Sequence, residues 1–521
     1  MGRLTEAVAN LTPEQRALLE QRLKRRRAGA ARPGIPRQGR EQNAFPLSFA
    51  QQRLWFLHRL TPESDAYNIP NAVHASGPLN LPALEQSVNE IRRRHEVLRT
   101  TFPVREGDPV QVIAPAEMTS LPLIDLSGLP APERETLARA LIEAESCRPF
   151  SLTGEPALRV NLLRLDAHAH IILFTMHHIV SDSWSVSVLV REMAALYDAF
   201  SNGRPSPLAE LPIQYADFAV WQRQWLQGDE LEKQQSYWKR QLSGVPPFLK
   251  LPTDRPRPAK QTFRGALHSM ALSKDLSADL LTLSRKQGVT LFMTLLAGFD
   301  LLLHYLTKQD DVVVGTDVAN RSPVETEGLI GFFVNQLVLR TDVSGNPTFQ
   351  EMLARVREVT LGAYANQVLP FEKLVEILNP DRSLGHSPLF QVKLILNSAP
   401  RGVLDFPHLK LGSLNGERTT AQLDITLPLW ETPEGIGGWV NYNTDLFDVT
   451  AIARLSALFE KLLGTVVALP RARVSELKEV LAAEDRRRQA ENEEGFARSS
   501  QQKLSRARRK PVSATTTKGA A

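Results

Sequence analysis

A buried strand followed directly by a helix is the clearest pattern of hydrophobic and polar positions along the chain. Residues 170–176 (His-Ile-Ile-Leu-Phe-Thr-Met) are apolar enough, and rich enough in β-branched side chains, for a buried strand. Residues 184–200 instead carry their apolar side chains at helical spacing. His177, His178 and Asp182 fall between these two segments. The pattern therefore predicts both histidines at a strand-to-helix junction.

Such a junction presents side chains to a cleft while packed elements hold them in one geometry, which is what a general base requires. Two interpretations of these residues are open at this point. His177 and His178 could form a catalytic site for acyl transfer, with Asp182 fixing the junction. Alternatively, Asp182 or Ser181 only caps the helix, and the histidines fill a turn as ordinary polar residues.

The two ends of the chain follow other patterns. Residues 12–15 (Thr-Pro-Glu-Gln) combine a cap residue, a proline at the first helical position and a glutamine at the capping-box position, so they predict a short helix. Residues 27–40 are rich in Pro, Gly and Arg, which is typical of a linker. From residue 482 onward a charged helical run loses its apolar positions, and roughly the last twenty residues are predicted to be disordered.

Composition narrows the class of protein. A chain of 521 residues, 42% of them hydrophobic, is too long for one compact core and can bury two, so two lobes are expected. The single cysteine, Cys147, excludes an internal disulfide framework and leaves no zinc signature. No apolar run approaches the roughly 18 residues of a membrane span, and the N-terminus lacks the hydrophobic core of a signal peptide. From these features we expect a soluble cytoplasmic protein.

The net charge of +5 is unevenly distributed along the chain. Residues 1–41 contain 10 basic and 4 acidic residues, and residues 484–521 contain 10 basic and 5 acidic residues, so the part between them is mildly acidic. Basic ends can contact nucleic acid, anionic surfaces or acidic proteins, but solvated tails have the same composition. The basic runs at 24–27 and 508–510 lack interleaved aromatic residues, which disfavours nucleic-acid binding.

Seven segments in collinear order place the histidine pair in a wider pattern. They are residues 47–57 (Leu-Ser-Phe-Ala-Gln-Gln-Arg-Leu-Trp-Phe-Leu), 94–102 (Arg-His-Glu-Val-Leu-Arg-Thr-Thr-Phe), 176–185 (Met-His-His-Ile-Val-Ser-Asp-Ser-Trp-Ser), 215–223 (Tyr-Ala-Asp-Phe-Ala-Val-Trp-Gln-Arg), 330–337 (Ile-Gly-Phe-Phe-Val-Asn-Gln-Leu), 369–375 (Leu-Pro-Phe-Glu-Lys-Leu-Val) and 386–391 (His-Ser-Pro-Leu-Phe-Gln). Together they resemble the condensation domains of nonribosomal peptide synthetases. The resemblance covers roughly residues 43–470, and its motifs are specific as a set.

The resemblance implies an α/β (α+β) fold with two lobes of the chloramphenicol acetyltransferase type. Each lobe would be a mixed sheet with helices, and the two would meet in a V-shaped arrangement with the active-site tunnel between them. The boundaries that we expect are an N-terminal docking helix and basic linker at 1–42, an N-lobe at 43–227, a C-lobe at 228–470 and a basic, partly disordered tail at 471–521.

The resemblance also implies an activity and partners. A condensation domain forms an amide bond when the amine of a carrier-bound aminoacyl acceptor attacks the thioester of a carrier-bound acyl or peptidyl donor. No cofactor is bound, because each substrate hangs on the 4′-phosphopantetheine arm of a peptidyl carrier protein. Nothing in the chain resembles an adenylation, carrier or thioesterase domain, so other synthetase subunits would deliver both substrates. Residues 48–57 and 381–390 resemble most the subtype that joins an L-donor to an L-acceptor.

The family's functional residues carry over to named positions. His178 would be the central catalytic residue, His177 would support its loop, and Asp182 would act structurally in a pair with an arginine. The candidates for that arginine, which the sequence does not rank, are Arg94, Arg99 and Arg340. The positions expected to line the substrate tunnel are Ser183, Trp184, Asn335 and His386.

One position departs from the family pattern, because Ser183 stands where that pattern has glycine after the aspartate. A serine adds a Cβ and a hydroxyl at the mouth of the site, but it is small, so we expect it to be tolerated or to tune acceptor access.

Other chemistries fit less well: there is no Gly-x-Ser-x-Gly nucleophile elbow, and His168, His170, His177 and His178 lack the carboxylate support of a metal site. The alternative from another class is a non-catalytic condensation-like module that recruits carrier proteins or a tailoring enzyme.

Overall fold

The chain forms two compact units. A computed structural model describes residues 34–321, 323–380, 383, 385–397, 409–414, 420–488 and 490. The predicted N-terminal helix and the predicted disordered end lie outside these residues. Of these described residues, the N-terminal unit contains those up to 230, those of 319–333 and 409–414, and the C-terminal unit contains those of 231–318, 334–397 and 420 onward.

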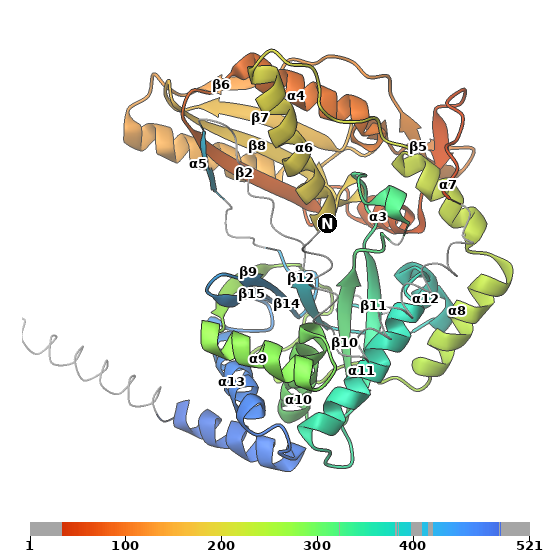
Figure 1. Ribbon diagram of the computed structural model, residues 1–521, viewed down its shortest axis with the longest axis vertical. Coiled ribbons are helices and arrows are strands. Elements are labelled where there is room, and N and C mark those ends of the chain that lie inside the picture. Colours follow the sequence, from red (N-terminus) through yellow and green to blue (C-terminus); the bar gives the residue numbers. More distant parts are fainter. Residues whose placement is uncertain are drawn as a thin grey trace, which may run out of the picture. The chain divides into compact units, whose positions relative to one another are not determined.

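The N-terminal unit contains a five-stranded sheet in the order β13-β2-β8-β7-β6 and a smaller sheet in which β1, β3 and β4 pair with β5 (Figure 1). Its strands are β1 (Ala44–Pro46), β2 (Asn68–Ser76), β3 (Thr100–Thr101), β4 (Val104–Arg105), β5 (Asp108–Ile113), β6 (Leu123–Asp125), β7 (Leu158–Arg164), β8 (Ala169–His177) and β13 (Lys410–Ser413). Its helices are α3 (Phe49–Leu60), α4 (Leu81–Arg94), α5 (Ala131–Cys147), α6 (Ser183–Ser201) and α7 (Tyr215–Trp225), with short 3-10 turns at Glu96–Arg99, His178–Val180 and Val324–Thr326.

Strand β8 is buried on both faces, which explains its continuous apolar run. Ile172 and Phe174 belong to the larger core beneath α4 and α6. Ile171 and Leu173 belong to a second cluster that includes Ala138 of α5. Figure 1 shows α4 and α6 on the side of the sheet opposite α5. The cores on the two faces of the sheet therefore hold β8, and with it the histidine at its end, in a fixed position.

The C-terminal unit contains a six-stranded sheet in the order β11-β10-β12-β14-β15-β9 (Figure 1). Its strands are β9 (Gly265–Ala271), β10 (Asp311–Val318), β11 (Asn335–Asp342), β12 (Val392–Asn397), β14 (Ile425–Thr432) and β15 (Gly435–Asn443). Its helices are α8 (Gly228–Gln241, which starts at the boundary), α9 (Lys274–Lys286), α10 (Leu291–Thr307), α11 (Phe349–Ala365), α12 (Phe371–Leu378) and α13 (Val449–Ala468). All of α10 from Leu291 to His304 is buried, so this helix is the centre of the unit's core.

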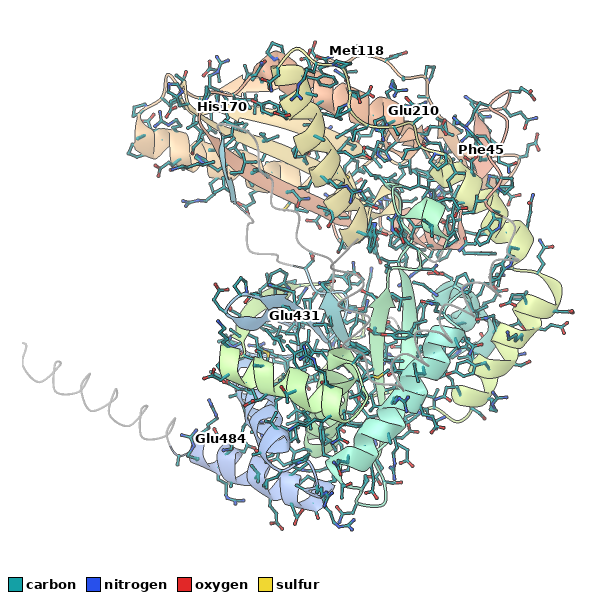
Figure 2. All side chains as sticks on the ribbon, in the orientation of Figure 1. Phe45, Met118, His170, Glu210, Glu431 and Glu484 are labelled. Carbon is teal, nitrogen blue, oxygen red and sulfur yellow. The ribbon has the colours of Figure 1, made fainter. Side chains whose placement is uncertain are left out.

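The units differ from the expected lobes in two respects. The described residues of 319–333 and 409–414 lie within the range expected for the second lobe, yet they pack in the N-terminal unit. Residues 474–488 are helical and packed, although the folded region was expected to end at 470. Leu477 and Leu481, one helical turn apart, are each 1% exposed, so this helix belongs to a core. Glu484, labelled in Figure 2, lies on the same helix.

Within the described ranges, no single helix is long and apolar enough to cross a membrane. One pair, α9 and α10, meets the length and composition criteria only together, and it is bent by 104°. The same residues contain no group of three or more His, Cys, Asp or Glu side chains placed to hold a metal ion.

Candidate active site

The structure confirms the predicted strand-to-helix junction. Strand β8 ends at His177, a 3-10 turn runs from His178 to Val180, and α6 begins at Ser183. Asp182 is the N-cap of α6, and its carboxylate accepts a hydrogen bond from the backbone N–H of Ser185 at 2.8 Å. Capping therefore fixes the start of the helix, and it is one of several contacts that Asp182 makes.

His177 is a buried, structural member of the junction. Its Nδ1 accepts a hydrogen bond from the backbone N–H of Ile179 at 3.0 Å, which closes the turn. The ring packs edge to face against Phe150 at a centroid distance of 5.9 Å. Burial is the main cause that holds the pKa of His177 well below its usual value, and the nearby His58 lowers it further. Burial therefore favours the neutral form of His177, and its Nδ1 holds the turn.

His178 is half-buried and its ring is oriented by two contacts. Its Nδ1 lies 3.0 Å from the backbone carbonyl oxygen of Ser181, and its ring meets that of Phe332 edge to face at a centroid distance of 5.5 Å. A carbonyl oxygen can only accept a hydrogen bond, so this contact places the ring proton on Nδ1. The neutral ring then carries its lone pair on Nε2, the nitrogen that could accept a proton from a substrate.

Asp182 pairs with Arg321, and the three predicted candidates for its arginine partner were wrong. Nη2 of Arg321 lies 3.1 Å from Oδ1 of Asp182, and both side chains are buried. Arg321 also donates to the backbone carbonyls of Thr326 at 2.6 Å and Leu329 at 2.7 Å. Burial lowers the pKa of the Arg321 guanidinium, while Asp182 acts to raise it.

Each predicted arginine has another partner. Arg94 is buried against the carboxylate of Glu192 in α6. Arg99 donates to the backbone carbonyl of Ala114, and Arg340 pairs with Asp311 at 2.7 Å in the C-terminal unit. The prediction failed because it considered arginines in and near the recognised motifs, whereas Arg321 lies outside all seven.

Residues 319–333 form a segment that three of the recognised motifs, 94–102, 176–185 and 215–223, hold in place. Ser185 of the histidine motif donates through its hydroxyl to the carbonyl of Gly331 at 2.7 Å and accepts from the N–H of Gly331 at 3.0 Å. The N–H of Ile330 points to Nδ1 of His95 at 3.3 Å. Tyr215 donates to the carbonyl of Phe332 at 2.6 Å, and its hydroxyl also contacts that of Ser48 at 2.8 Å.

This arrangement explains why motifs far apart in sequence belong together. The 319–333 segment brings the ring of Phe332 against His178, and it brings the N–H of Phe333 to Oδ2 of Asp182 at 3.1 Å. Sequence reasoning found these motifs as a set but missed the roles of Arg321 and Phe332. For Phe332, the one indication in the sequence was the Ile-Gly-Phe-Phe run at 330–333.

Two of the predicted substrate-facing residues lie at the start of α6. Ser183 is the first helical residue and is exposed, and its φ is not positive. Its position therefore does not require the conformational freedom of glycine. Trp184 is half-buried, and its indole N–H donates to the backbone carbonyl of Glu327 at 2.9 Å. Trp184 thus contributes another contact to the 319–333 segment.

The other two predicted residues, Asn335 and His386, lie in the C-terminal unit. The amide group of Asn335 donates to the carbonyls of Gln367 and Leu369, both at 2.8 Å, and accepts from the N–H of Phe371 at 3.0 Å. Its side chain is thus engaged in holding backbone. His386 is half-buried, with Nδ1 3.0 Å from the carbonyl of Ser387.

Comparison with known families decides the affiliation of the chain. A family model described as the condensation domain matches residues 41–487. The chain belongs to the condensation domain family. A linear gramicidin synthase protein from Brevibacillus parabrevis is 49% identical over 427 residues, which is 82% of this chain and 6% of that protein. The chain spans less than a tenth of the length of the three linear gramicidin synthase proteins that it matches.

Solved structures support the same affiliation. The X-domain from teicoplanin biosynthesis superposes with a TM-score of 0.77 at 29% identity, covering 85% of this chain and 99% of that domain. A four-domain nonribosomal peptide synthetase bound to AMP and glycine superposes with a TM-score of 0.73 at 25% identity, covering 84% of this chain and 34% of that protein. The predicted α/β fold class of the chloramphenicol acetyltransferase type is thereby confirmed.

Proposed function

We propose that this condensation domain forms peptide bonds in nonribosomal peptide synthesis. It would join a carrier-bound acyl or peptidyl thioester to the amine of a carrier-bound aminoacyl acceptor. The observation that carries the proposal is the orientation of His178, whose Nδ1 is directed to the carbonyl of Ser181. Membership of the condensation domain family and similarity to linear gramicidin synthase support the reaction class.

The chemistry follows from the tautomer of His178. An α-ammonium group titrates near pH ~8 and an imidazole near ~6.5, so a neutral histidine is available at physiological pH. As the acceptor amine attacks, the new C–N bond forms, the C–S bond breaks and its electron pair leaves with the pantetheine sulfur. Nε2 of His178 would take the proton from the amine and return it to the thiolate, or would hold the amine by a hydrogen bond. Positioning of two tethered substrates supplies the rest of the catalysis.

The neighbouring residues act on geometry in this proposal. His177 closes the turn through Ile179, and Asp182 fixes both the start of α6 and the 319–333 segment. Both residues touch protein groups, so we assign them as positioning residues and His178 as the catalytic residue.

The finer identity of substrates and partners belongs to the same proposal. Donor and acceptor would each arrive on a 4′-phosphopantetheine arm of a peptidyl carrier protein, with no cofactor bound to the domain itself. The partners would be these carrier proteins and other synthetase subunits, consistent with the much longer relative in which the matched region is 6% of the whole. We also propose an L-configured donor and acceptor, from the resemblance of residues 48–57 and 381–390. We propose a cytoplasmic location from the single cysteine.

A second candidate function is recruitment without catalysis. It is favoured by the X-domain from teicoplanin biosynthesis, which is known in complex with OxyB and matches this chain with a TM-score of 0.77 at 30% identity. A recruitment module has no chemical use for an oriented histidine, and for this reason we rank catalysis first.

The deciding experiment is single-turnover transfer between two loaded carrier proteins, followed by intact-protein mass spectrometry. We expect the native chain to move the donor acyl group onto the acceptor carrier and His178→Ala to abolish the transfer. His168→Ala, which removes an exposed histidine at the other end of β8, is the matched control. If the native chain binds both carriers but transfers nothing, recruitment is the better assignment.

A further inference from the structure

Among the described residues, one edge of strand β7 is without a paired strand over about half of the length of β7. Strand β6 pairs with β7 only from Leu162 to Arg164, and the N–H of Leu162 donates to the carbonyl of Pro122 at 2.9 Å. Backbone groups of alternate residues in a strand point to the same side. The N–H and C=O groups of Leu158 and Val160 therefore point to the same side as those of Leu162, and within the described part of the chain no strand pairs with them there.

The cause is a loop that is drawn away from β7 onto helix α4. The side-chain amide of Asn89 donates to the carbonyl of Thr119 at 2.9 Å and accepts from its N–H at 3.0 Å. The carboxylate of Glu85 accepts from the N–H of Leu121 at 2.8 Å. Met118, which precedes this loop, is exposed and is labelled in Figure 2. The chain thus joins β7 as a paired strand only after Pro122.

The gap forms a cavity of about 300 Å³. Apolar side chains from the helix, the loop and the strand make one part of its wall, and these are Val88, Leu121, Leu158 and Val160. The charged part of the wall consists of three guanidinium groups, those of Arg92, Arg148 and Arg159, and one carboxylate, that of Glu85. A cavity that combines apolar wall, unpaired strand backbone and positive charge has the features of a peptide-binding groove.

The protein neutralises the three guanidinium groups unequally. Arg159 is bonded to Glu145 at 2.6 Å and lies 3.5 Å from Glu155, while Arg148 lies 3.8 Å from Glu155 and 4.0 Å from Glu145. Arg92 donates to the hydroxyl of Thr119, and it forms no ion pair with any carboxylate of the described residues. Burial lowers the pKa of the Arg92 guanidinium, which shows that this charge is partly withdrawn from water without an acidic partner. An acidic ligand would supply the missing partner.

We propose that the uncovered edge of β7 is a docking site for an extended, acidic peptide segment of a partner protein. The segment would add as a strand beside Leu158–Asn161, with backbone hydrogen bonds to Val160. Its side chains would alternate between the two sides of the sheet, so that one reaches Val88 and Arg92 while its neighbours reach Arg148. The site is separate from His178, and the proposal does not depend on the catalytic function.

The test uses the full chain and two fluorescein-labelled probe peptides. One has the sequence acetyl-Thr-Glu-Val-Glu-Thr-amide, and the other carries lysine in place of both glutamates. Fluorescence anisotropy is expected to show saturable binding of the acidic probe and at least about tenfold weaker binding of the basic probe. Hydrogen exchange of the backbone amide of Val160 should slow when the acidic probe is bound. Absence of binding up to about 1 mM probe, equal binding of both probes, or binding without slower exchange at Val160 would each overturn the proposal.

Matched variants locate the binding. Arg92→Glu should weaken binding of the acidic probe at least about tenfold. Arg164→Glu changes a partly exposed arginine of the same strand that pairs with Asp125 outside the cavity, so it should keep the affinity within about twofold. Circular dichroism checks that each variant is folded, and Arg92→Gln replaces Arg92→Glu if the latter does not fold. Equal losses in the Arg92 and Arg164 variants would show a general charge effect and contradict the assigned site.

Discussion

Arg321 and Asp182 form an ion pair from which water is nearly excluded, with 2% and 0% of their side-chain surfaces exposed and an N–O distance of 3.1 Å. Burying two charges is costly unless hydrogen bonds satisfy both. Here Asp182 accepts from the backbone N–H groups of Ser185 and Phe333, and Arg321 donates to the hydroxyl of Ser185 as well as to backbone carbonyls. The pair thus ties the start of α6 to the segment that carries Phe332.

Removing the arginine should leave Asp182 buried without its counter-charge. We expect Arg321→Ala to lower the free energy of unfolding of the N-terminal unit by about 3–5 kcal/mol. Urea unfolding followed by tryptophan fluorescence measures the change. The control is Arg164→Ala, which breaks an exposed pair with Asp125 and should cost less than about 1 kcal/mol. Similar losses of unfolding free energy in both variants would show that the buried Arg321–Asp182 pair stabilises the unit no more than an exposed pair does.

Gly331 is required by the close approach of Tyr215. A Cβ at Gly331 would lie 2.0 Å from Cδ2 of Tyr215, whose ring is held by the carbonyl of Phe332 and by Ser48. We expect Gly331→Ala to destabilise the unit by about 1–3 kcal/mol and to slow carrier-to-carrier transfer, because the clash displaces Phe332.

Gly328→Ala in the same segment is the matched control for this prediction. A Cβ at Gly328 would meet only Cδ2 of Leu211 at 3.7 Å, which is an ordinary contact. Thermal unfolding and single-turnover transfer of the two variants check the difference. Equal behaviour of the two alanine variants would contradict the role assigned to Tyr215.

Much of the site could be predicted because the strand, the turn and the helix that form it are consecutive in the sequence. The apolar run that forms β8, the histidine pair and the helical spacing after Asp182 all lie within about thirty residues, so strand, turn and helix follow from local periodicity. The family resemblance added the collinear motifs and the fold class. Both kinds of signal depend on patterns that are visible without knowing which distant residues meet.

The partner of Asp182 could not be predicted for the opposite reason. Arg321 lies 139 residues further along the chain, and nothing in its neighbours marks it as an ion-pair partner. The assignment of residues 319–333 to the N-terminal unit was missed on the same ground, since this segment contains little regular structure beyond one short turn. Asn335 was expected to face substrate, but its side chain bonds four backbone groups, a role that only the tertiary structure reveals.

His177 should make the unit sensitive to acid. The pKa of this buried histidine lies well below 6.5 in the folded chain, so the unfolded chain takes up the proton first as the pH falls. The resulting stability is present above about pH 6.5 and is lost below it, at up to about 1.4 kcal/mol per pH unit. His177→Asn keeps an acceptor for the N–H of Ile179 but does not titrate, and its stability should fall less between pH 7.5 and 5.5.

Urea unfolding at pH 7.5, 6.5 and 5.5 measures this pH dependence. His168→Asn, which removes an exposed histidine near the other end of β8, should retain the dependence of the native chain. If His177→Asn loses stability with acid as steeply as the native chain, another group is responsible.

Asp300 is a buried carboxyl group in the core helix α10 of the C-terminal unit. Neither of its oxygens has a hydrogen-bond partner among the described residues, and burial raises its pKa well above the usual value. The folded chain therefore holds this proton to higher pH than the unfolded chain. The sign is opposite to that of His177: stability is complete below about pH 3.9 and is lost as the pH rises towards the folded pKa.

Replacing Asp300 by its neutral analogue should remove that loss. We expect Asp300→Asn to be more stable than the native chain at pH 8, by an amount that shrinks as the pH falls at up to about 1.4 kcal/mol per unit. Asp279→Asn, on the exposed side of α9, should change stability by less than about 0.5 kcal/mol. Thermal melts of the three proteins from pH 5 to 8 make the comparison, and a stability gain that does not vary with pH would contradict titration as its cause.

Ser183 tests whether the departure from the family pattern matters for catalysis. Its side chain is exposed at the first position of α6, where its φ is not positive, so the backbone gains nothing from glycine. Ser183→Gly should lower stability by no more than about 1 kcal/mol, the cost of glycine in a helix, and should leave the single-turnover transfer rate within about twofold of the native chain. Because the residue lies directly after Asp182, a larger effect on transfer without an effect on folding would mean that the hydroxyl meets the acceptor. A chain that transfers only as Ser183→Gly would instead show that the serine blocks the site, and the native protein would then be a recruitment module.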